Sequence, residues 1–233
     1  MRRALIFDCD GVLVDTERDG HRVAFNTAFR AAGLDIEWDV PFYSKMLQVA
    51  GGKERIRAYF DDTGWPEHAR DRDAFVKDLH RVKSDAFLDL MKEGSLSLRP
   101  GVSRFVDRAL ALNMQLAVCS TSKLESVESC VALLGHERAS QFTAVLAGDI
   151  VSRKKPDPEI YLLAQEKLNV AADECLVIED SEIGCAAAVA AGCRCVVTTS
   201  AYTAEEDFAG AYRVLPELGD GEGSVSLDEL IGE

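Results

Sequence analysis

ALIFDCDG, residues 4–11, is the segment that most directly indicates how this chain folds. The uninterrupted apolar run Ala4–Phe7 predicts a strand that is buried on both faces, as in a parallel sheet. Asp8 and Asp10 follow this run, and the two-residue period of an extended chain places both carboxylates on one side. Gly11 then permits a turn. We therefore expect a buried strand that ends in two acids.

More apolar or β-branched runs follow in the second half of the chain, and helical patterns alternate with them. The expected strands are Gln115–Cys119, Ala144–Ala147, Cys175–Ile178 and Arg194–Thr198. Helices are expected over Asp157–Leu168, with a proline in its first turn, and over Ile183–Ala191, which Gly192 closes. This alternation predicts an α/β fold with a doubly wound, Rossmann-like parallel sheet and helices on both faces.

Residues 16–95 follow a different pattern, rich in charge and helical in period, without a strand-like run. The expected helices are His21–Ala32, Lys53–Thr63 and Asp71–Lys92, the last as one long helix or two shorter ones. We predict an α/β core formed by residues 1–15 and 96–233, with an all-helical cap, residues 16–95, inserted after the first strand. The acidic, glycine-bearing tail after Gly219 is expected to pack loosely.

The chain is strongly acidic: 26 lysine and arginine residues against 40 aspartate and glutamate residues give a net charge of −14. Such a protein is a poor partner for nucleic acid or an anionic membrane, and it repels anionic metabolites at long range. An anionic substrate would need local cations or a metal ion. The apolar run before Asp8 is too short for a signal peptide, and we expect neither a transit peptide nor a transmembrane helix.

The seven cysteines are odd in number and irregularly spaced, and most lie in apolar runs. This pattern predicts buried free thiols in a reducing compartment rather than a disulfide framework. Cys193 and Cys195 have no second pair of cysteines or histidines at zinc spacing, so we expect no metal site there.

Three further motifs place polar groups where a predicted strand ends or a helix begins. Glu179 and Asp180 follow one strand, Ser120–Ser122 follow another, and Lys155 precedes a helix. Each has a plainer explanation as a strand-end turn, a helix N-cap or a solvated lysine. Ligands of open parallel sheets, however, bind at the carboxyl ends of the strands. An acid pair, a hydroxyl, a lysine and a set of oxygen ligands for Mg²⁺ together predict phosphoryl transfer.

These motifs, in this order, resemble those of the haloacid dehalogenase superfamily of phosphatases and phosphomutases, and the insert resembles its helical-cap class. Further segments resemble the CbbY-type family of photosynthetic organisms: Asp15–Glu17, Gly20–His21, Gly51–Arg55, His80 and Lys83, Leu98–Gly101, and Ala201–Thr203. That family is similar to β-phosphoglucomutase but acts as a phosphatase on xylulose-1,5-bisphosphate, a side product that inhibits Rubisco.

The resemblance implies a Mg²⁺-dependent phosphatase and a catalytic role for several core residues. Asp8 is expected to attack phosphorus and form an aspartyl phosphate. Asp10 is expected to act as general acid and then as general base. Mg²⁺ is expected on Asp8, the backbone carbonyl of Asp10, and Asp180, with Glu179 in or near the outer shell.

Other residues are expected to bind substrate, and the cap to determine specificity. Ser120 and Lys155 are expected to contact the transferring phosphoryl group. The segment Gly51–Arg55 offers backbone N–H groups and two cations that could bind a second phosphate. The alternative interpretation of this segment is a turn before an ordinary charged helix. The alternative interpretation of His21 is a surface histidine at the start of a helix. The expected substrate-binding residues are Glu17, His21, Gly51, Gly52, Lys53, Arg55, Lys83, Thr121 and Ser122.

Three other functions fit parts of the sequence. A β-phosphoglucomutase or a generic sugar-phosphate phosphatase shares the core chemistry and differs in the cap. A dehalogenase of the same fold needs neither Mg²⁺ nor an acid at the position of Asp10, so Asp10 and the pair Glu179 and Asp180 weigh against this function. A receiver-like, phospho-accepting signalling module also uses an aspartate, a hydroxyl and a lysine, but it is shorter and lacks the helical insert.

The resemblance also implies the biological setting. The expected reaction converts xylulose-1,5-bisphosphate to xylulose-5-phosphate. We expect a monomer without nucleic-acid or membrane partners, linked to Rubisco through its inhibitor rather than through stable binding. The expected compartment is the chloroplast stroma in a plant or alga and the cytoplasm otherwise.

Overall fold

The structure is a computed structural model that describes residues 3–47, 49, 52–94, 96–148 and 150–232. The chain divides into two compact units, one formed by Met1–Asp15 with Ser97–Glu233 and the other by Thr16–Leu96. We call them the core and the cap.

The core is built on a six-stranded parallel sheet with the strand order β3-β2-β1-β4-β5-β6. The strands are β1 (Ala4–Phe7), β2 (Gln115–Cys119), β3 (Phe142–Leu146), β4 (Cys175–Glu179), β5 (Arg194–Thr198) and β6 (Arg213–Leu215). Phe7 of β1 is in register with Val118 of β2 and Ile178 of β4, so the polar residues beyond these three strands begin at one level. The predicted α/β fold with a parallel sheet is confirmed.

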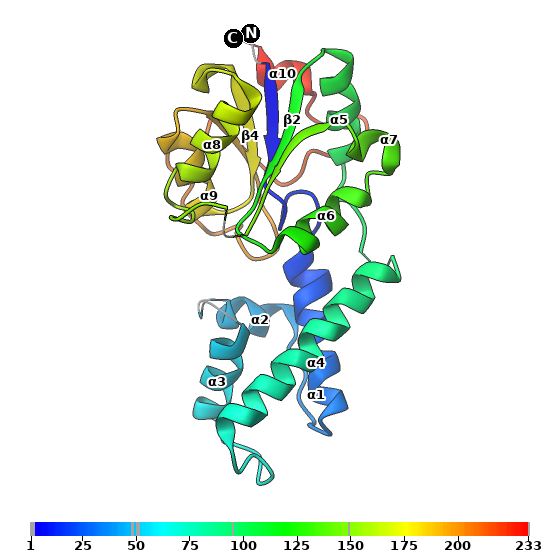
Figure 1. Cartoon of the computed structure of the whole chain (residues 1–233), viewed down its shortest axis with the longest axis vertical. Coiled ribbons are helices and arrows are strands. Elements are labelled where there is room, and N and C mark those ends of the chain that lie inside the picture. Colours follow the sequence, from blue (N-terminus) through cyan, green and yellow to red (C-terminus); the bar gives the residue numbers. More distant parts are fainter. Residues whose placement is uncertain (1–2, 48, 50–51, 95, 149, 233) are drawn as a thin grey trace. The chain divides into compact units, whose positions relative to one another are not determined.

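Helices cover both faces of this sheet. The core helices are α5 (Val102–Ala111), α6 (Leu124–Ala132), α7 (His136–Ala139), α8 (Glu159–Leu168), α9 (Glu182–Ala190) and α10 (Leu227–Ile231). In Figure 1, α8 and α9 lie on one side of the sheet, and α5 and α6 lie on the other. Every residue of β1 and β4 is buried, as expected for strands enclosed between two helical layers.

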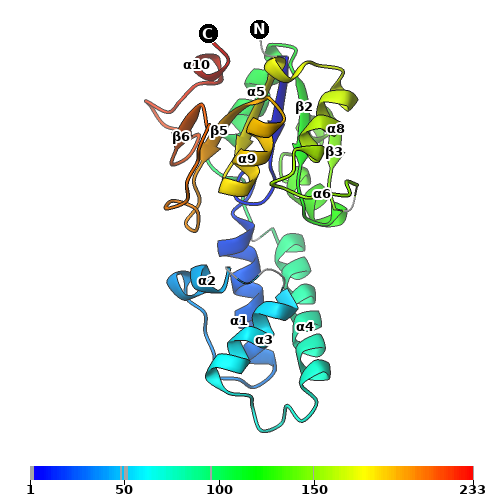
Figure 2. The same ribbon diagram turned by 90° about the vertical axis from the view of Figure 1, so that its left-hand side faces the viewer.

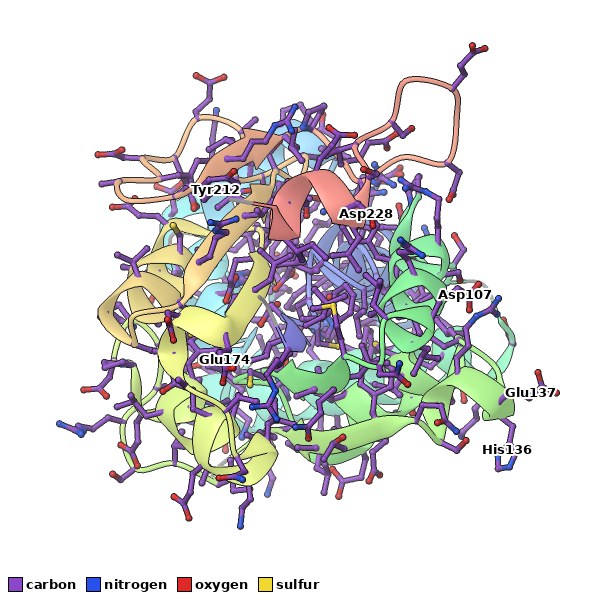
Figure 3. The ribbon with its side chains drawn as sticks, turned by 90° about the horizontal axis from the view of Figure 1, so that it is seen from above. Asp107, His136, Glu137, Glu174, Tyr212 and Asp228 are labelled. Carbon is purple, nitrogen blue, oxygen red and sulfur yellow. The ribbon has the colours of Figure 1, made fainter. Side chains whose placement is uncertain are left out.

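The end of the chain differs from the prediction. The expectation of a loosely packed tail is wrong, because Leu227 and Leu230 are buried and α10 begins with a capping box of Ser226 and Glu229. Arg108 of α5 binds Asp228 of α10, which is labelled in Figure 3. Strand β6, next to β5 at the edge of the sheet in Figure 2, was also not anticipated.

The described part of the cap consists of helices and connecting loops. Its elements are a π-helical turn (Thr16–His21), α1 (Arg22–Ala31), α2 (Val40–Met46), α3 (Gly52–Thr63) and α4 (Arg72–Lys92). Helix α4 is one continuous helix, and it lies beside α1 in both views (Figures 1 and 2). Large buried aromatic side chains fill the interior: Phe25, Phe29, Trp38, Tyr43 and Phe60.

The seven cysteines are all buried free thiols, as predicted. Within the described ranges, no helix combines the length and the apolar character that crossing a bilayer requires.

Candidate active site

The carboxyl ends of three adjacent strands meet at Lys155, which precedes α8. Its Nζ atom lies 2.6 Å from Asp8 Oδ1, just after β1, and 2.6 Å from Glu179 Oε1 at the end of β4. A third hydrogen bond, of 2.9 Å, runs to the carbonyl of Cys119 at the end of β2. One buried lysine therefore joins the ends of β2, β1 and β4.

Three buried carboxylates form a group that can hold a metal ion. Ligand atoms of Asp8, Glu179 and Asp180 all lie within 4.8 Å of one another. When all three carboxyl groups are ionised, Lys155 balances one of their charges, and a divalent ion would balance the other two. A set of donors made only of carboxylate oxygens suits a hard cation. The residues present therefore fit a hard divalent ion.

Crowding and burial shift the ionisation of these groups. Burial raises the pKa of Asp8 to about 8, although the positive charge of Lys155 opposes the shift. Burial and the negative charges of Asp8 and Glu179 raise the pKa of Asp180 well above its usual range. Burial lowers the pKa of Lys155, but Asp8 and Glu179 outweigh it and the net shift is upward. The site therefore keeps Lys155 charged and favours a proton or a metal ion on the carboxyl groups.

Neighbouring donors occupy the carboxylate of Glu179. Its Oε1 atom accepts hydrogen bonds from Lys155 and from the hydroxyl of Tyr161, and its Oε2 atom accepts one from the backbone N–H of Asp180 at 3.1 Å. Gly184 provides the space, since a Cβ atom there would lie 2.1 Å from Glu179 Oε2. Glu179 is thus oriented by the protein itself.

The side chain of Asp10 is bonded to the loop that follows β2. Its Oδ2 atom accepts hydrogen bonds from Ser122 Oγ at 2.6 Å and from Ser120 Oγ at 3.2 Å. The N-cap residue of α6 is Lys123, which makes no side-chain capping bond. The serine hydroxyls therefore orient Asp10 rather than cap the helix. Thr121, between them, is exposed.

A glutamate in the first turn of α8 closes the loop that carries Lys155. Glu159 accepts hydrogen bonds from the N–H and the hydroxyl of Ser152 and from the N–H of Arg153. These bonds, first among them that from the Ser152 N–H, lower the pKa of Glu159 to about 2. The Lys155–Pro156 peptide bond in this loop is cis.

In the cap, a hydrogen-bonded chain links three of the polar side chains. Arg55 Nη1 donates to the hydroxyl of Tyr43 at 2.8 Å, and this hydroxyl donates to Glu17 Oε2 at 2.6 Å. Arg55 Nε donates to the carbonyl of Met46 at 2.9 Å. Arg55 is buried, with 8 % of its surface exposed.

A second buried cation of the cap lies beside His21. Lys83 Nζ is 2.9 Å from His21 Nδ1, and it lies 5.1 Å and 5.3 Å from the ring centroids of Phe25 and Phe87. Aromatic faces stabilise a cation by their quadrupole. Lys83 is therefore kept in the interior by rings and an imidazole.

The remaining expected cap residues lie at the start of α3. Gly52 opens this helix and is half-buried, whereas Lys53 is exposed. Gly51 lies outside the described residues. Of the two cations expected in this segment, the structure buries Arg55 and leaves Lys53 at the surface.

Two tyrosines in contact with these sites were not anticipated. Tyr161 donates to Glu179 in the core, and Tyr43 joins Arg55 to Glu17 in the cap. The sequence signal available for Tyr161 was its place on a helix that begins just after Lys155. Nothing in the sequence marked Tyr43, because helix α2 was itself not predicted.

Comparisons with known proteins identify the family of this chain. The haloacid dehalogenase-like hydrolase family matches residues 2–192. A CBBY-like protein of Arabidopsis thaliana is 51 % identical over 222 residues, which cover 93 % of this chain and 69 % of the relative. The protein CbbY of Cereibacter sphaeroides is 40 % identical over 230 residues, 98 % of this chain and 97 % of the relative.

Solved structures share the fold. CbbY from Rhodobacter sphaeroides in complex with phosphate has a TM-score of 0.76 and 40 % identity, covering 93 % of this chain and 95 % of that one. A mutant of that CbbY in complex with xylulose-1,5-bisphosphate gives the same TM-score of 0.76. The chain therefore belongs to the haloacid dehalogenase-like hydrolase family. Within that family it is similar to the CbbY proteins, and it is a phosphatase.

Proposed function

We propose that this protein is a Mg²⁺-dependent phosphatase that converts xylulose-1,5-bisphosphate to xylulose-5-phosphate. The observation that carries the proposal is the setting of Asp8, which lies 2.6 Å from Lys155 within a group of three buried carboxylates. A CbbY solved in complex with xylulose-1,5-bisphosphate supports the choice of substrate.

The proposed reaction proceeds through Asp8 and Asp10. A carboxylate oxygen of Asp8 attacks the phosphorus while the bond from phosphorus to the sugar oxygen breaks, and Asp10 protonates that leaving oxygen. The product is an aspartyl phosphate. Asp10 then takes a proton from a water molecule that attacks this phosphorus, which releases Asp8 and inorganic phosphate. Ser120 and Lys155 hold the phosphoryl oxygens during both steps.

In this proposal Mg²⁺ is held by Asp8, Asp180 and the backbone carbonyl of Asp10. When bound, the ion supplies positive charge that stabilises the phosphoryl oxygens in the transition state. Glu179 is assigned to the outer shell, because its oxygens already accept hydrogen bonds from Lys155, Tyr161 and the N–H of Asp180. Its role is to keep Lys155 beside Asp8.

The cap is proposed to bind the rest of the substrate. A bisphosphate carries a second dianion that the core chemistry does not neutralise. Arg55 and Lys83 are buried cations, and His21 lies against Lys83, so these residues are assigned to the second phosphate. Glu17 is assigned to a sugar hydroxyl, with Tyr43 holding its carboxylate at 2.6 Å.

The test is phosphate release in the presence of Mg²⁺ from xylulose-1,5-bisphosphate, ribulose-1,5-bisphosphate and β-glucose-1-phosphate, with Asp8→Asn as the blank. Selective release from the xylulose compound is expected, and none from the variant. Preference for β-glucose-1-phosphate would contradict the proposed substrate. A long-lived phosphorylated Asp8 without turnover would instead indicate a receiver-like signalling module.

The proposal extends to the setting. Removal of xylulose-1,5-bisphosphate would link the enzyme to Rubisco through loss of an inhibitor, with no stable complex between them. We place it in the chloroplast stroma of a plant or alga, or otherwise in the cytoplasm, and we expect a monomer. Size-exclusion chromatography with light scattering, alone and with Rubisco, tests the last two points.

A further inference from the structure

Arg99 follows the segment that returns the chain from the cap to the core, and its side chain reaches the ends of three strands. Its guanidinium donates to the carbonyl of Gly11, in the loop after β1. It also donates to the carbonyls of Thr198 at 3.1 Å and Thr199 at 2.7 Å, at the end of β5, and to that of Pro216 at 3.2 Å, just after β6. Four carbonyl groups thus converge on one cation.

The strand order shows which parts of the sheet the side chain of Arg99 connects. In the sheet, β4 lies between β1 and β5, so the link from Gly11 to Thr198 spans the strand that precedes Asp180. Gly11, with a φ of +81°, lies directly against that carboxylate, since a Cβ atom on it would be 2.0 Å from Asp180 Oδ2. The peptide that Arg99 holds is therefore packed against Asp180 and is adjacent to Asp10 in the chain.

The backbone of this loop makes further hydrogen bonds. Gly11 N–H donates to the carbonyl of Val14 at 2.8 Å, and Leu13 N–H donates to the carbonyl of Cys9 at 2.9 Å. The backbone N–H of Arg99 donates to the carbonyl of Leu13 at 2.8 Å. These bonds shape the loop but do not connect it to β5 or β6, whereas the side chain of Arg99 does.

We propose that Arg99 is a positioning residue for the phosphatase reaction, which fixes the loop of Asp8 and Asp10 against Asp180 through the carbonyl of Gly11. The hydrogen bonds described above go to backbone carbonyls, and the positive charge of Arg99 also opposes the rise in the pKa of Asp180. The planar guanidinium is suited to this role, because it offers several donors in a fixed geometry that a lysine ammonium cannot reproduce. The inference rests on the proposed function, since it assumes that these three acids act on a phosphate ester.

Arg104 provides a matched control within the core. It is also half-buried, and its guanidinium donates to the carbonyls of Leu218 at 2.8 Å, Gly219 at 2.6 Å and Val225 at 3.0 Å. None of these belongs to the loop after β1. Arg104→Ala therefore removes a comparable set of bonds to carbonyls without releasing Gly11.

The experiment compares Arg99→Ala, Arg99→Lys and Arg104→Ala with the wild type in Mg²⁺-dependent hydrolysis of p-nitrophenyl phosphate. Melting temperature and hydrogen exchange of the 8–14 peptide are measured on the same samples. Both alanine variants should melt lower, but only Arg99→Ala should lose kcat, by about 10²-fold at similar KM, because small misplacement of catalytic groups has effects of that size. Arg99→Lys should fall between, and added guanidinium at non-denaturing concentration should partly restore Arg99→Ala alone.

Faster exchange over residues 8–14 is expected in Arg99→Ala and not in Arg104→Ala. Equal losses of kcat in the two alanine variants, or wild-type kcat in Arg99→Ala, would overturn the proposal. If Arg99→Ala does not fold, Arg99→Lys with unchanged kcat and loop exchange would overturn it equally. If the wild type hydrolysed no phosphate ester, the proposed function would fail, while the exchange comparison would still decide whether Arg99 fixes the loop.

Discussion

The core and the cap offer a ligand opposite charge. In the core, three buried carboxylates surround one lysine, and their ligand atoms lie within 4.8 Å of one another. In the cap, two buried cations, Arg55 and Lys83, lie among aromatic rings, with Glu17 as the carboxylate of the hydrogen-bonded chain. The core group requires a cation to balance it, whereas the cap group suits an anion.

The two groups also differ in how they are held. Core side chains are fixed at the ends of adjacent parallel strands, where each hydrogen bond joins residues far apart in the chain. Cap cations are held by the faces of rings and by few hydrogen bonds. Changes in the core should therefore affect every phosphate ester alike, and changes in the cap should affect some substrates more than others.

Apart from the loss of the nucleophile in Asp8→Asn, the largest effect is expected from Asp10→Asn. An amide cannot transfer the proton in either half of the reaction, so kcat should fall by at least ~10²–10⁴, the usual contribution of a general acid or base. Phosphate release from mono- and bisphosphates should decrease by the same factor. The control is Asp107→Asn on α5 (Figure 3), which removes an exposed partner of Arg138 and should leave kcat unchanged. A loss confined to bisphosphates would contradict the assignment of Asp10 to the chemistry.

The cap side of the comparison is tested by Lys83→Met. Loss of a buried cation from the proposed second-phosphate site should lower kcat/KM for xylulose-1,5-bisphosphate by about 10- to 100-fold, and far less for a monophosphate. Lys77→Met, on the same helix but exposed, is the matched control. Equal losses on both kinds of substrate would remove the case for a second-phosphate site at Lys83.

The core site was predictable from sequence because its residues follow apolar runs that end buried strands. Asp8, Ser120 and Glu179 each come immediately after such a run, Asp180 is one residue further on, and parallel pairing then places them at one edge. Lys155 was identifiable by its place before a helix. The strand boundaries of β1 and β2 were predicted to the residue for the same reason.

The contacts that orient these residues were not predictable. Tyr161 reaches Glu179 across 18 positions, and Arg99 reaches Gly11 across 88, so no local pattern marks either. Strand β6 has three residues that are mostly exposed, which gives no apolar period to detect. The tail after Gly219 was misjudged because its composition is polar, whereas the few apolar residues it has, such as Leu230, are buried.

The raised pKa of Asp8 predicts that Mg²⁺ binds more tightly as pH rises. Asp8 has an ordinary pKa of 3.8 in an unfolded chain and a pKa of about 8 in the metal-free fold. Between these values the folded state holds a proton that the unfolded state has lost, so this group lowers the stability of the metal-free protein as pH rises. Mg²⁺ competes with that proton. The rise in melting temperature on adding Mg²⁺ should therefore be larger at pH 8 than at pH 6.

The matched variant for this measurement is Asp180→Asn, which removes one proposed ligand and should reduce the rise at both pH values. At a Mg²⁺ concentration 100 times Kd, the wild-type gain in unfolding free energy should be about 2.7 kcal/mol. A gain in melting temperature that fell with rising pH would contradict the raised pKa of Asp8.

The smallest effect is expected from Glu159→Gln, which separates positioning from stability within the core. Its carboxylate closes the loop of Lys155, and its pKa of about 2 means that its stabilising effect is present above its ordinary value of 4.5 and is lost as pH falls through 2. The matched control is Glu229→Gln in α10, far from the loop of Lys155 in the chain. Its carboxylate accepts hydrogen bonds from Ser226 N at 3.2 Å and from Ser226 Oγ at 2.9 Å.

Both variants should melt slightly lower at pH 7. Only Glu159→Gln should also lose kcat. The loss should be smaller than the ~10²-fold expected for a displaced catalytic group. It is small because three hydrogen bonds still hold Lys155 itself. Equal kcat in the two variants would mean that those bonds alone position the lysine.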